Sequence, residues 1–249
     1  MGLIADFLGR GANWSGPDGI PTRIAEHLQY TFLALLFVCA IALPLGLYVG
    51  HTGRGSVAIA GSANVLRALP DFGLLVYIVL LISGSLPAQL AYLLPSVIVL
   101  VILGIPAVLS ATYAGVQGVD PAARDAARGM GMTGRQVLWQ VEVPNALPLI
   151  ISGIRASMLQ IVATATIAAY VSLGGLGRFI IDGQSQRDYS QMAAGAVLVG
   201  ALAIVLDLLA SGIQRLVVSP GVSGRFRSAG PRRRPAPIAS PEEAIVISP

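Results

Sequence analysis

Residues 120–148 read DPAARDAARGMGMTGRQVLWQVEVPNALP and form a charged, amphipathic segment between two long apolar segments. Asp120 followed by Pro121 is typical of a helix N-cap and first helical position. Thr133 with Gln136 predicts a capping box that opens a second short helix after a glycine break. Two short helices joined by a glycine turn would suit the docking of a soluble partner, although the shape alone fits an ordinary connecting loop equally well.

The composition around this segment is that of an integral membrane protein. Hydrophobic residues make up 55% of the 249 positions and charged residues 11%, whereas a soluble domain carries about a quarter charged residues. A helical span needs roughly 20 mainly apolar residues, and four long runs lack every Asp, Glu and Arg. The longest run has room for two helices, separated by a turn signal at 83–87. The sequence therefore predicts an all-α membrane protein with five transmembrane helices, near 28–50, 62–84, 88–115, 147–171 and 191–217.

These spans divide the chain into three parts. One membrane domain, 28–217, is expected to follow an extracytoplasmic segment, 1–27, and to precede a disordered cytoplasmic tail, 218–249, rich in Pro, Ser and Arg. The N-terminal segment lacks the basic region and apolar core of a signal peptide. Its apolar side chains predict a short interfacial helix formed by Leu3, Ile4, Phe7, Leu8 and Trp14.

The basic residues exclude several chemistries. All sixteen are arginine, so a Walker A phosphate loop and a Schiff base, which need lysine, are both excluded. The histidines, His27 and His51, stand at either end of the first predicted span and are expected to be interfacial. The single cysteine, Cys39, lies within that span and is expected to be a packing residue. We expect no catalytic residue, no metal and no cofactor in this chain.

Arginine placement predicts the orientation. With the N-terminus outside, the cytoplasmic segments hold twelve arginines and the outer segments hold four, namely Arg10, Arg23, Arg178 and Arg187. Positive residues concentrate on the cytoplasmic side of membrane proteins. The segment 120–148 and the C-terminus are therefore expected in the cytoplasm of a bacterial cell, with the N-terminus outside its inner membrane.

The spacing within this loop resembles a known motif. Asp125-Ala126-Ala127, three residues, Gly131, nine residues, Val141, one residue and Val143-Pro144 follow the order of the EAA loop of ABC-importer permeases. That pattern is Glu-Ala-Ala, three, Gly, nine, Ile, one, Leu-Pro, so every gap matches and the substitutions are mild. The aspartate is one methylene shorter than glutamate, so any ion pair from this position needs different partner geometry.

The resemblance covers about residues 28–217 and extends to one branch of the family. The segments 66–70, 127–132, 164–169 and 174–177 are similar to permeases that import glycine betaine, carnitine, choline and related osmoprotectants. Methionine and other amino-acid importers share the five-span core, the MetI-like type I permease fold, and remain an alternative. The resemblance implies a second permease subunit (identical or paralogous), a separate ATPase that uses ATP and Mg²⁺, and an extracytoplasmic substrate-binding protein.

It also implies roles for the loop residues. The family's loop is a coupling helix that lies in a groove on the ATPase, which assigns coupling to Asp125, Ala126, Ala127, Arg128, Gly131, Val141, Val143 and Pro144. Gly131 would supply a turn, through positive φ or through close approach of the partner. The two alanines would keep the first helix slim, and charged side chains would set the register on the partner. Pro144 and Pro148 are expected to end the amphipathic segment and start the fourth span.

Small and hydroxyl residues suggest where the pore and outer gate lie. Such residues allow close helix packing and hinge motion, and they cluster at Thr164, Thr166, Gly174, Gly175 and Gly177. Asp207 lies inside the fifth predicted span, where an acid is a functional candidate by default. Its position near the cytoplasmic end favours local hydrogen bonding or pairing.

Two other classes of protein fit less well. An ion-coupled secondary transporter would want an ionisable relay near the membrane midplane and paired broken helices, and Asp207 alone offers itself. An intramembrane enzyme would need a constellation of His, Asp, Glu or Ser facing a cavity, which the sequence does not suggest. The sequence therefore favours an ABC-importer permease.

Overall fold

The computed structural model describes residues 2–57, 61, 65, 66 and 68–218. Every described element is a helix, and three of the η elements are 3-10 helices whereas η3 is a π-helical turn. The elements are α1 (Gly2–Leu8), η1 (Gly11–Trp14), α2 (Ile20–Thr52), α4 (Asp71–Ile82), η2 (Ser83–Ser85), α5 (Leu93–Gln117), α6 (Pro121–Gly129), α7 (Gly134–Val137), η3 (Leu138–Glu142), α8 (Val143–Ala168), η4 (Ala169–Val171), α9 (Gly177–Gln186) and α10 (Tyr189–Val217).

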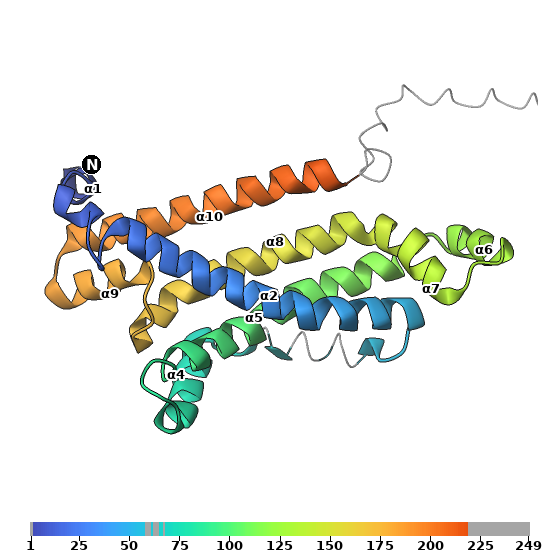
Figure 1. The fold of residues 1–249 in the computed structure, drawn as a ribbon, viewed down its shortest axis with the longest axis horizontal. Coiled ribbons are helices and arrows are strands. Elements are labelled where there is room, and N and C mark those ends of the chain that lie inside the picture. Colours follow the sequence, from blue (N-terminus) through green and yellow to red (C-terminus); the bar gives the residue numbers. More distant parts are fainter. Residues whose placement is uncertain (1, 58–60, 62–64, 67, 219–249) are drawn as a thin grey trace, which may run out of the picture.

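Three long helices, α2, α5 and α8, pack together and form the centre of the molecule (Figure 1). Each helix satisfies its own backbone hydrogen bonds, as a segment surrounded by lipid must. Their buried contact surface is apolar and is built from Ala34, Val38, Ala42, Leu100, Val108, Leu109, Ile161 and Ala165. Alanine and β-branched residues at these positions let the helix backbones approach closely, which is what drives helix association in a membrane.

Gly46 and Gly153 are two of the glycines at which neighbouring helices approach α5 closely. A Cβ added at Gly46 of α2 would lie 2.7 Å from the Cβ of Thr112. A Cβ added at Gly153 of α8 would overlap the side chain of Ala111 and lie 3.0 Å from the carbonyl oxygen of Ala107. A larger residue at either position would push these helices apart. The glycines therefore allow the short interhelical distance.

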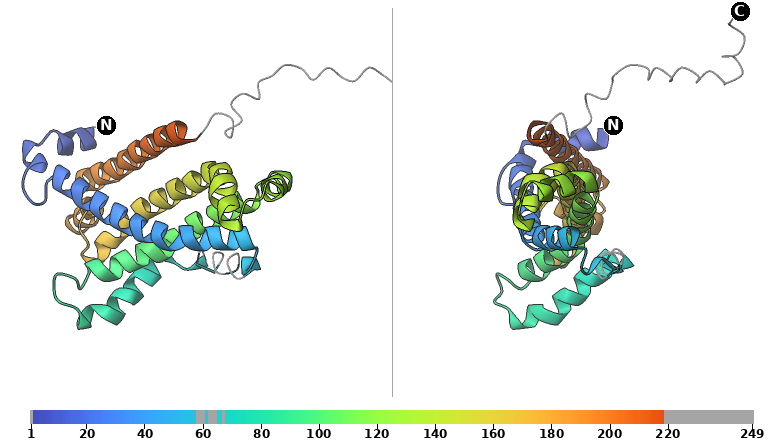
Figure 2. Two further views of the ribbon diagram at one scale, coloured as in Figure 1. Left: turned by 45° about the vertical axis from the view of Figure 1, so that its right-hand side comes forward. Right: turned by 90° about the vertical axis from the view of Figure 1, so that its right-hand side faces the viewer.

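Helices α10 and α4 flank the central helices on opposite sides (Figures 1 and 2). Arg155 of α8 and Asp207 of α10 form a bidentate ion pair, in which Nη2 donates to Oδ2 at 2.6 Å and Nε donates to Oδ1. The prediction that Asp207 is locally paired is confirmed. Because both charges lie in apolar helices, this pairing removes the cost of leaving either one alone there.

The N-terminal residues fold onto the same end of the molecule as α9. The short helix predicted there is confirmed as α1, and Phe7 packs edge-on against Phe179 with ring centroids 5.5 Å apart. Helix α2 then begins at Ile20, well before the predicted residue 28. Its extra turns carry charged residues that pair with one another, because Arg23 donates to Glu26 at 2.9 Å.

The observed spans agree with four of the five predicted ones. Four helices are long and apolar enough to cross a membrane within the described residues: 20–52, 93–117, 134–171 and 189–217. The predicted second span, 62–84, is described only in part. Helix α4 supplies 12 residues of it, fewer than the roughly 20 that a span needs, and residues 62–64 and 67 lie outside the described part of the chain. Apart from Val218, the predicted tail also lies outside it.

The loop and the fourth span are joined without a break, which corrects one expectation. Residues 134–171 form one continuous helix, with Pro144 in the first turn of α8 and Pro148 inside it. Just before Pro144 the helix widens into the π turn η3, where the N–H of Val143 bonds to the carbonyl of Leu138. The wider turn accommodates a residue that lacks an N–H donor, so the prolines do not end the helix.

Candidate functional site: the loop between α5 and α8

Two short helices, α6 and α7, project from the end of the bundle opposite α1 (Figure 1). Both predicted caps are confirmed. The carboxylate of Asp120 accepts the N–H of Ala122 at 2.9 Å. The N–H of Thr133 donates to Gln136 Oε1 at 2.8 Å, and the N–H of Gln136 donates to Thr133 Oγ1 at 3.4 Å, which completes the capping box. Side chains therefore satisfy donors at the start of each helix.

Gly131 ends α6 in a Schellman motif. Its φ is +87°, its N–H donates to the carbonyl of Arg128 at 2.9 Å, and the N–H of Met132 donates to the carbonyl of Ala127 at 3.2 Å. A Cβ at Gly131 would meet no atom of the chain within 4 Å. The left-handed backbone conformation therefore explains the glycine here, rather than a clash inside this chain.

The residues predicted to contact the ATPase divide by exposure. Exposed to solvent are Asp125, Ala126, Arg128, Gly131 and Pro144. Val141 and Val143 are half-buried, and Ala127 is 2% exposed. Only one alanine of the pair, Ala126, therefore faces outward, while the other packs α6 onto the chain. The exposed Asp125 and Arg128 charges lie 3.8 Å apart, a separation at which an ion pair contributes little stability in water.

A buried carboxylate lies beneath α6. Glu142 is 1% exposed, and its Oε2 is hydrogen-bonded to His51 Nδ1 at 2.6 Å. Arg124 Nε lies 3.0 Å from Glu142 Oε1, at ion-pair distance but without hydrogen-bond alignment. Arg124 also donates through Nη2 to the carbonyl of Val116. The Arg124 guanidinium and the hydrogen bond with His51 offset the high cost of removing a carboxylate from water.

We refer to His51, Arg124 and Glu142 as the Glu142 cluster. It joins four elements at one point, because His51 ends α2, Arg124 lies on α6, Glu142 lies in η3, and the acceptor Val116 is near the end of α5. The loop is thus bonded to three of the long helices. A displacement of α6 by a docked partner would act directly on the ends of those helices.

Sequence reasoning missed this cluster. It treated His51 as an interfacial residue and gave Glu142 no role. One signal was present, because Glu142 occupies the unspecified position between Val141 and Val143 in the matched motif, and an acid there interrupts an apolar stretch. Nothing in the sequence pairs it with His51, which is 91 residues away.

The predicted pore threonines have different surroundings. Thr164 is 1% exposed, and its Oγ1 donates to Asp71 Oδ2 at 3.3 Å, so it links α8 to the start of α4. Thr166 donates instead to the carbonyl of Val162 in its own helix, at 3.1 Å. Of the two, only Thr164 connects different elements of the bundle.

The three predicted gate glycines form a tight turn between η4 and α9 that packs on the start of α2. The N–H of Gly175 donates to Glu26 Oε2 at 2.7 Å, and its φ is +89°. Gly174 also faces the Glu26 side chain, and a Cβ at Gly177 would overlap the carbonyl of Thr166. The gating role of these glycines stays a prediction.

His27 lies under this turn and is fully buried, with Nε2 3.1 Å from the carbonyl of Val162. The expectation of an interfacial histidine was wrong at this position, because α2 begins eight residues earlier than predicted and the turn covers the ring. Within the described residues, no three side chains of His, Cys, Asp or Glu gather in a way that could hold a metal ion.

The chain matches a known family over most of its length. Residues 42–220 match the family described as "Binding-protein-dependent transport system inner membrane component". The chain is 32% identical over 203 residues to the glycine betaine/carnitine/choline transport system permease protein OpuCB of Bacillus subtilis, covering 81% of this chain and 90% of that protein. It is 34% identical over 203 residues to the osmoprotectant import permease protein OsmW of Salmonella typhimurium, covering 79% and 91%.

Solved structures support the same fold. The bundle superimposes with a TM-score of 0.69 on a chain from inward-facing conformations of the MetNI methionine ABC transporter, covering 78% of this chain and 94% of that one. The sequence identity is 22%. This likeness supports the membrane-embedded helical architecture and carries no information about substrate.

Proposed function

The chain belongs to the family of binding-protein-dependent transport system inner membrane components, and on that premise we propose that it is the permease subunit of an ATP-driven importer of compatible solutes. It is a multi-pass membrane protein of the permease type. The observation that carries the substrate class is the likeness to osmoprotectant permeases at 32–34% identity over about nine-tenths of their length.

The alternative is an importer of methionine or another amino acid. Its support is structural, since the methionine transporter chain shares the fold at 22% identity. The higher sequence identity to permeases named for glycine betaine, carnitine and choline favours quaternary ammonium compounds as the cargo.

The proposed partners follow from the chemistry of the chain. Without lysine it cannot form a Walker A site, so ATP and Mg²⁺ would be bound by a separate ATPase subunit. A second permease, identical or paralogous, would complete the translocation path, and a binding protein would deliver the solute. The arginine bias supports a location of α6 and α7 in the bacterial cytoplasm and of the N-terminus outside.

The proposed mechanism is alternating access driven through the loop. Closure of the ATPase dimer would displace α6, and the exposed residues Asp125, Ala126 and Gly131 would be its contact surface. The Glu142 cluster would pass the displacement to α2, α5 and α8, because it bonds the loop to the ends of those helices. The spans would then rock between inward-open and outward-open states.

The test uses the complete importer reconstituted in liposomes with its ATPase and binding protein. Vesicles that contain the wild-type importer, with its ATPase facing the lumen and ATP enclosed there, should accumulate glycine betaine, choline or carnitine from the outside. Gly131→Arg should insert normally but abolish uptake and receptor-stimulated ATP hydrolysis. An arginine at φ +87° costs about 1–2 kcal/mol in local conformation, and its side chain would obstruct the docking surface.

Gly129→Ala is the matched control. Gly129 is an exposed glycine at the end of the same helix, with open space around its Cβ position and an ordinary backbone conformation. This variant should keep both activities. Normal stimulated hydrolysis by Gly131→Arg would refute the coupling role, whereas uptake of methionine but of no quaternary amine would refute the substrate class.

A further inference from the structure

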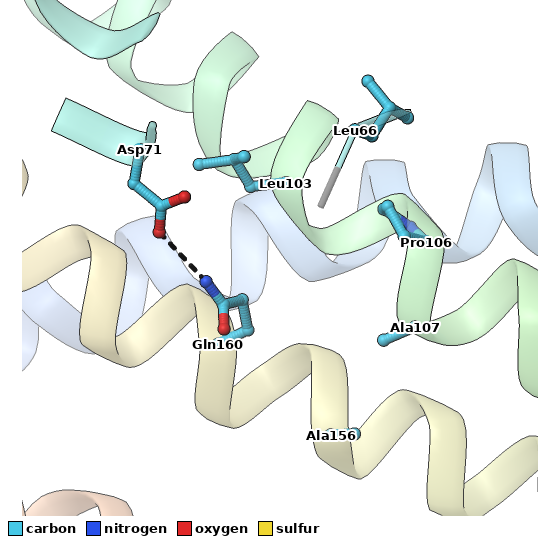
Figure 3. A pocket seen from close by; sticks show the side chains of 7 residues that line it. All are labelled: Leu66, Asp71, Leu103, Pro106, Ala107, Ala156 and Gln160. Carbon is cyan, nitrogen blue, oxygen red and sulfur yellow. Dashed lines mark hydrogen bonds between the residues drawn. The ribbon is translucent and has the colours of Figure 1, made fainter. Parts of the chain in front are cut away.

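A cavity of about 280 Å³ lies between α4, α5 and α8 (Figure 3). Its polar lining groups are the side chains of Asp71 and Gln160, which point toward one another in the figure. Much of the remaining wall is apolar and includes Leu103, Ala107 and Ala156. The cavity therefore combines one carboxylate and one amide with a surface that suits methyl and methylene groups.

In the residues that the structure describes, the partners of the Asp71 carboxylate are neutral. Its Oδ2 accepts from Gln160 Nε2 at 3.1 Å and from Thr164 Oγ1 at 3.3 Å. Among the described residues, no arginine or histidine lies within ion-pair distance of it. The hydrogen bonds orient the carboxylate without neutralising its charge.

The depth of Asp71 in the membrane indicates what its charge faces. Asp71 meets α8 at Gln160, in the middle of a helix that crosses a membrane by length and composition. An ionisable residue at such depth faces a water-filled path or a partner, because exposure to lipid is costly. Gln160 is itself exposed on a face of α8 that also carries the small residues Ser152, Ala156 and Ala163. An exposed amide is poorly suited to contact with hydrocarbon, while Leu149 and Ile167 on the same face are apolar and exposed.

The lining selects the chemical class of ligand. A carboxylate and an amide oxygen are too few for a bare divalent ion, which takes six or more oxygen ligands. The apolar wall instead suits a cation that carries its own alkyl groups. Next to Asp71, Phe72 forms an edge-to-face pair with Tyr170, ring centroids 5.0 Å apart, and both rings are exposed. Aromatic faces attract quaternary ammonium groups.

We propose that this cavity is a transit site for the positively charged head of an alkylammonium solute, with Asp71 as its counter-ion and Gln160 and Thr164 as the groups that position the carboxylate. The site would hold the solute between its release by the binding protein and its exit. The inference rests on the proposed function, which supplies the class of solute.

The first experiment measures transport by the reconstituted importer with its binding protein saturated. Asp71→Asn keeps the shape of the side chain and one acceptor oxygen while removing the charge. Choline uptake should fall at least about tenfold, while receptor-stimulated ATP hydrolysis is retained, because the loop and the ATPase surface are untouched. Asp6→Asn is the matched control, since Asp6 is an exposed acid on α1, outside the cavity, and it should change neither quantity.

The second experiment does not depend on which solute the importer carries. In a Cys39→Ser background, Ala107→Cys places a single thiol in the cavity wall. Choline should slow the reaction of this thiol with a maleimide in the assembled importer, and Asp71→Asn should abolish the protection. Glucose, a neutral solute, should give no protection in either protein.

The outcomes separate this inference from the proposed function. If wild-type importer carries choline and Asp71→Asn carries it equally fast, the site is refuted and the function stands. If Asp71→Asn loses uptake and stimulated hydrolysis together, Asp71 is structural and the site is again refuted. If no quaternary amine is transported, the proposed function fails, and thiol protection alone decides whether the cavity binds an alkylammonium ion.

Discussion

Glu142 lies within the continuous helix 134–171, and Asp71 contacts the same helix at Gln160. The two carboxylates nevertheless have opposite surroundings. Glu142 is fully buried and has a histidine and an arginine as partners. Asp71 is half-buried beside a cavity, and its partners in the described part of the chain are an amide and a hydroxyl. A buried acid that is paired with a cation of its own chain holds helices together. An acid whose partners are neutral donors keeps its charge available to a bound cation. Asp207, paired with Arg155 but partly exposed, lies between these cases.

The largest expected effect comes from removing the Glu142 charge. Glu142→Gln leaves the Arg124 guanidinium without its counter-charge at the buried carboxylate position, and breaking such a pair costs about 3–5 kcal/mol. The melting temperature of the purified importer should drop, and stimulated ATP hydrolysis should become uncoupled from uptake.

Asp125→Asn provides the matched comparison for stability, because Asp125 is an exposed acid of the same loop. Its melting temperature should stay near that of wild type. If Glu142→Gln melts as Asp125→Asn does, then the buried cluster does not brace the loop.

An intermediate effect is expected at Asp207. Asp207→Asn should lower the melting temperature, since Arg155 then lacks its bidentate partner between α8 and α10. Adding Arg155→Gln should recover part of the loss, because the pair would become neutral on both sides. A double variant no more stable than Asp207→Asn would show that the two charges do not stabilise each other.

The smallest effect on stability is expected at Asp71. Asp71→Asn should change the free energy of unfolding by about 1 kcal/mol or less, since the amide oxygen of asparagine can still accept from Gln160 and Thr164 and a typical hydrogen bond contributes on that scale, while transport of an alkylammonium solute falls. Thermal unfolding and uptake measured on the same preparation would check this. A large loss of stability would show that Asp71, like Glu142, has a structural role.

Local signals were readable from the sequence because they depend on neighbouring residues. The Asp120 cap, the Thr133–Gln136 box and the turn at Gly131 involve positions within five residues of each other, and all three are present. The apolar runs likewise marked four spanning helices.

Distant pairs could not be read in this way. His51 and Glu142 are 91 residues apart, and Asp71 and Gln160 are 89 apart, so only the fold brings them together. The π turn was missed for a related reason, since a proline ordinarily predicts a helix end and the widened turn that tolerates it leaves no separate pattern. The burial of His27 was missed because charged residues that pair with each other extended α2 beyond its apolar run.

The continuous helix from Gly134 to Val171 has a mechanical consequence. At about 1.5 Å per residue, Glu142 and Gln160 are two points on one rod roughly 27 Å apart. Pro148 lies inside this rod, so a push at the loop end would reach Gln160 partly as translation and partly as bending at the proline. The bond from Gln160 to Asp71 is 3.1 Å long, and a hydrogen bond weakens when its donor shifts relative to its acceptor. Movement at the loop end of this rod would therefore change how firmly the amide holds the Asp71 carboxylate.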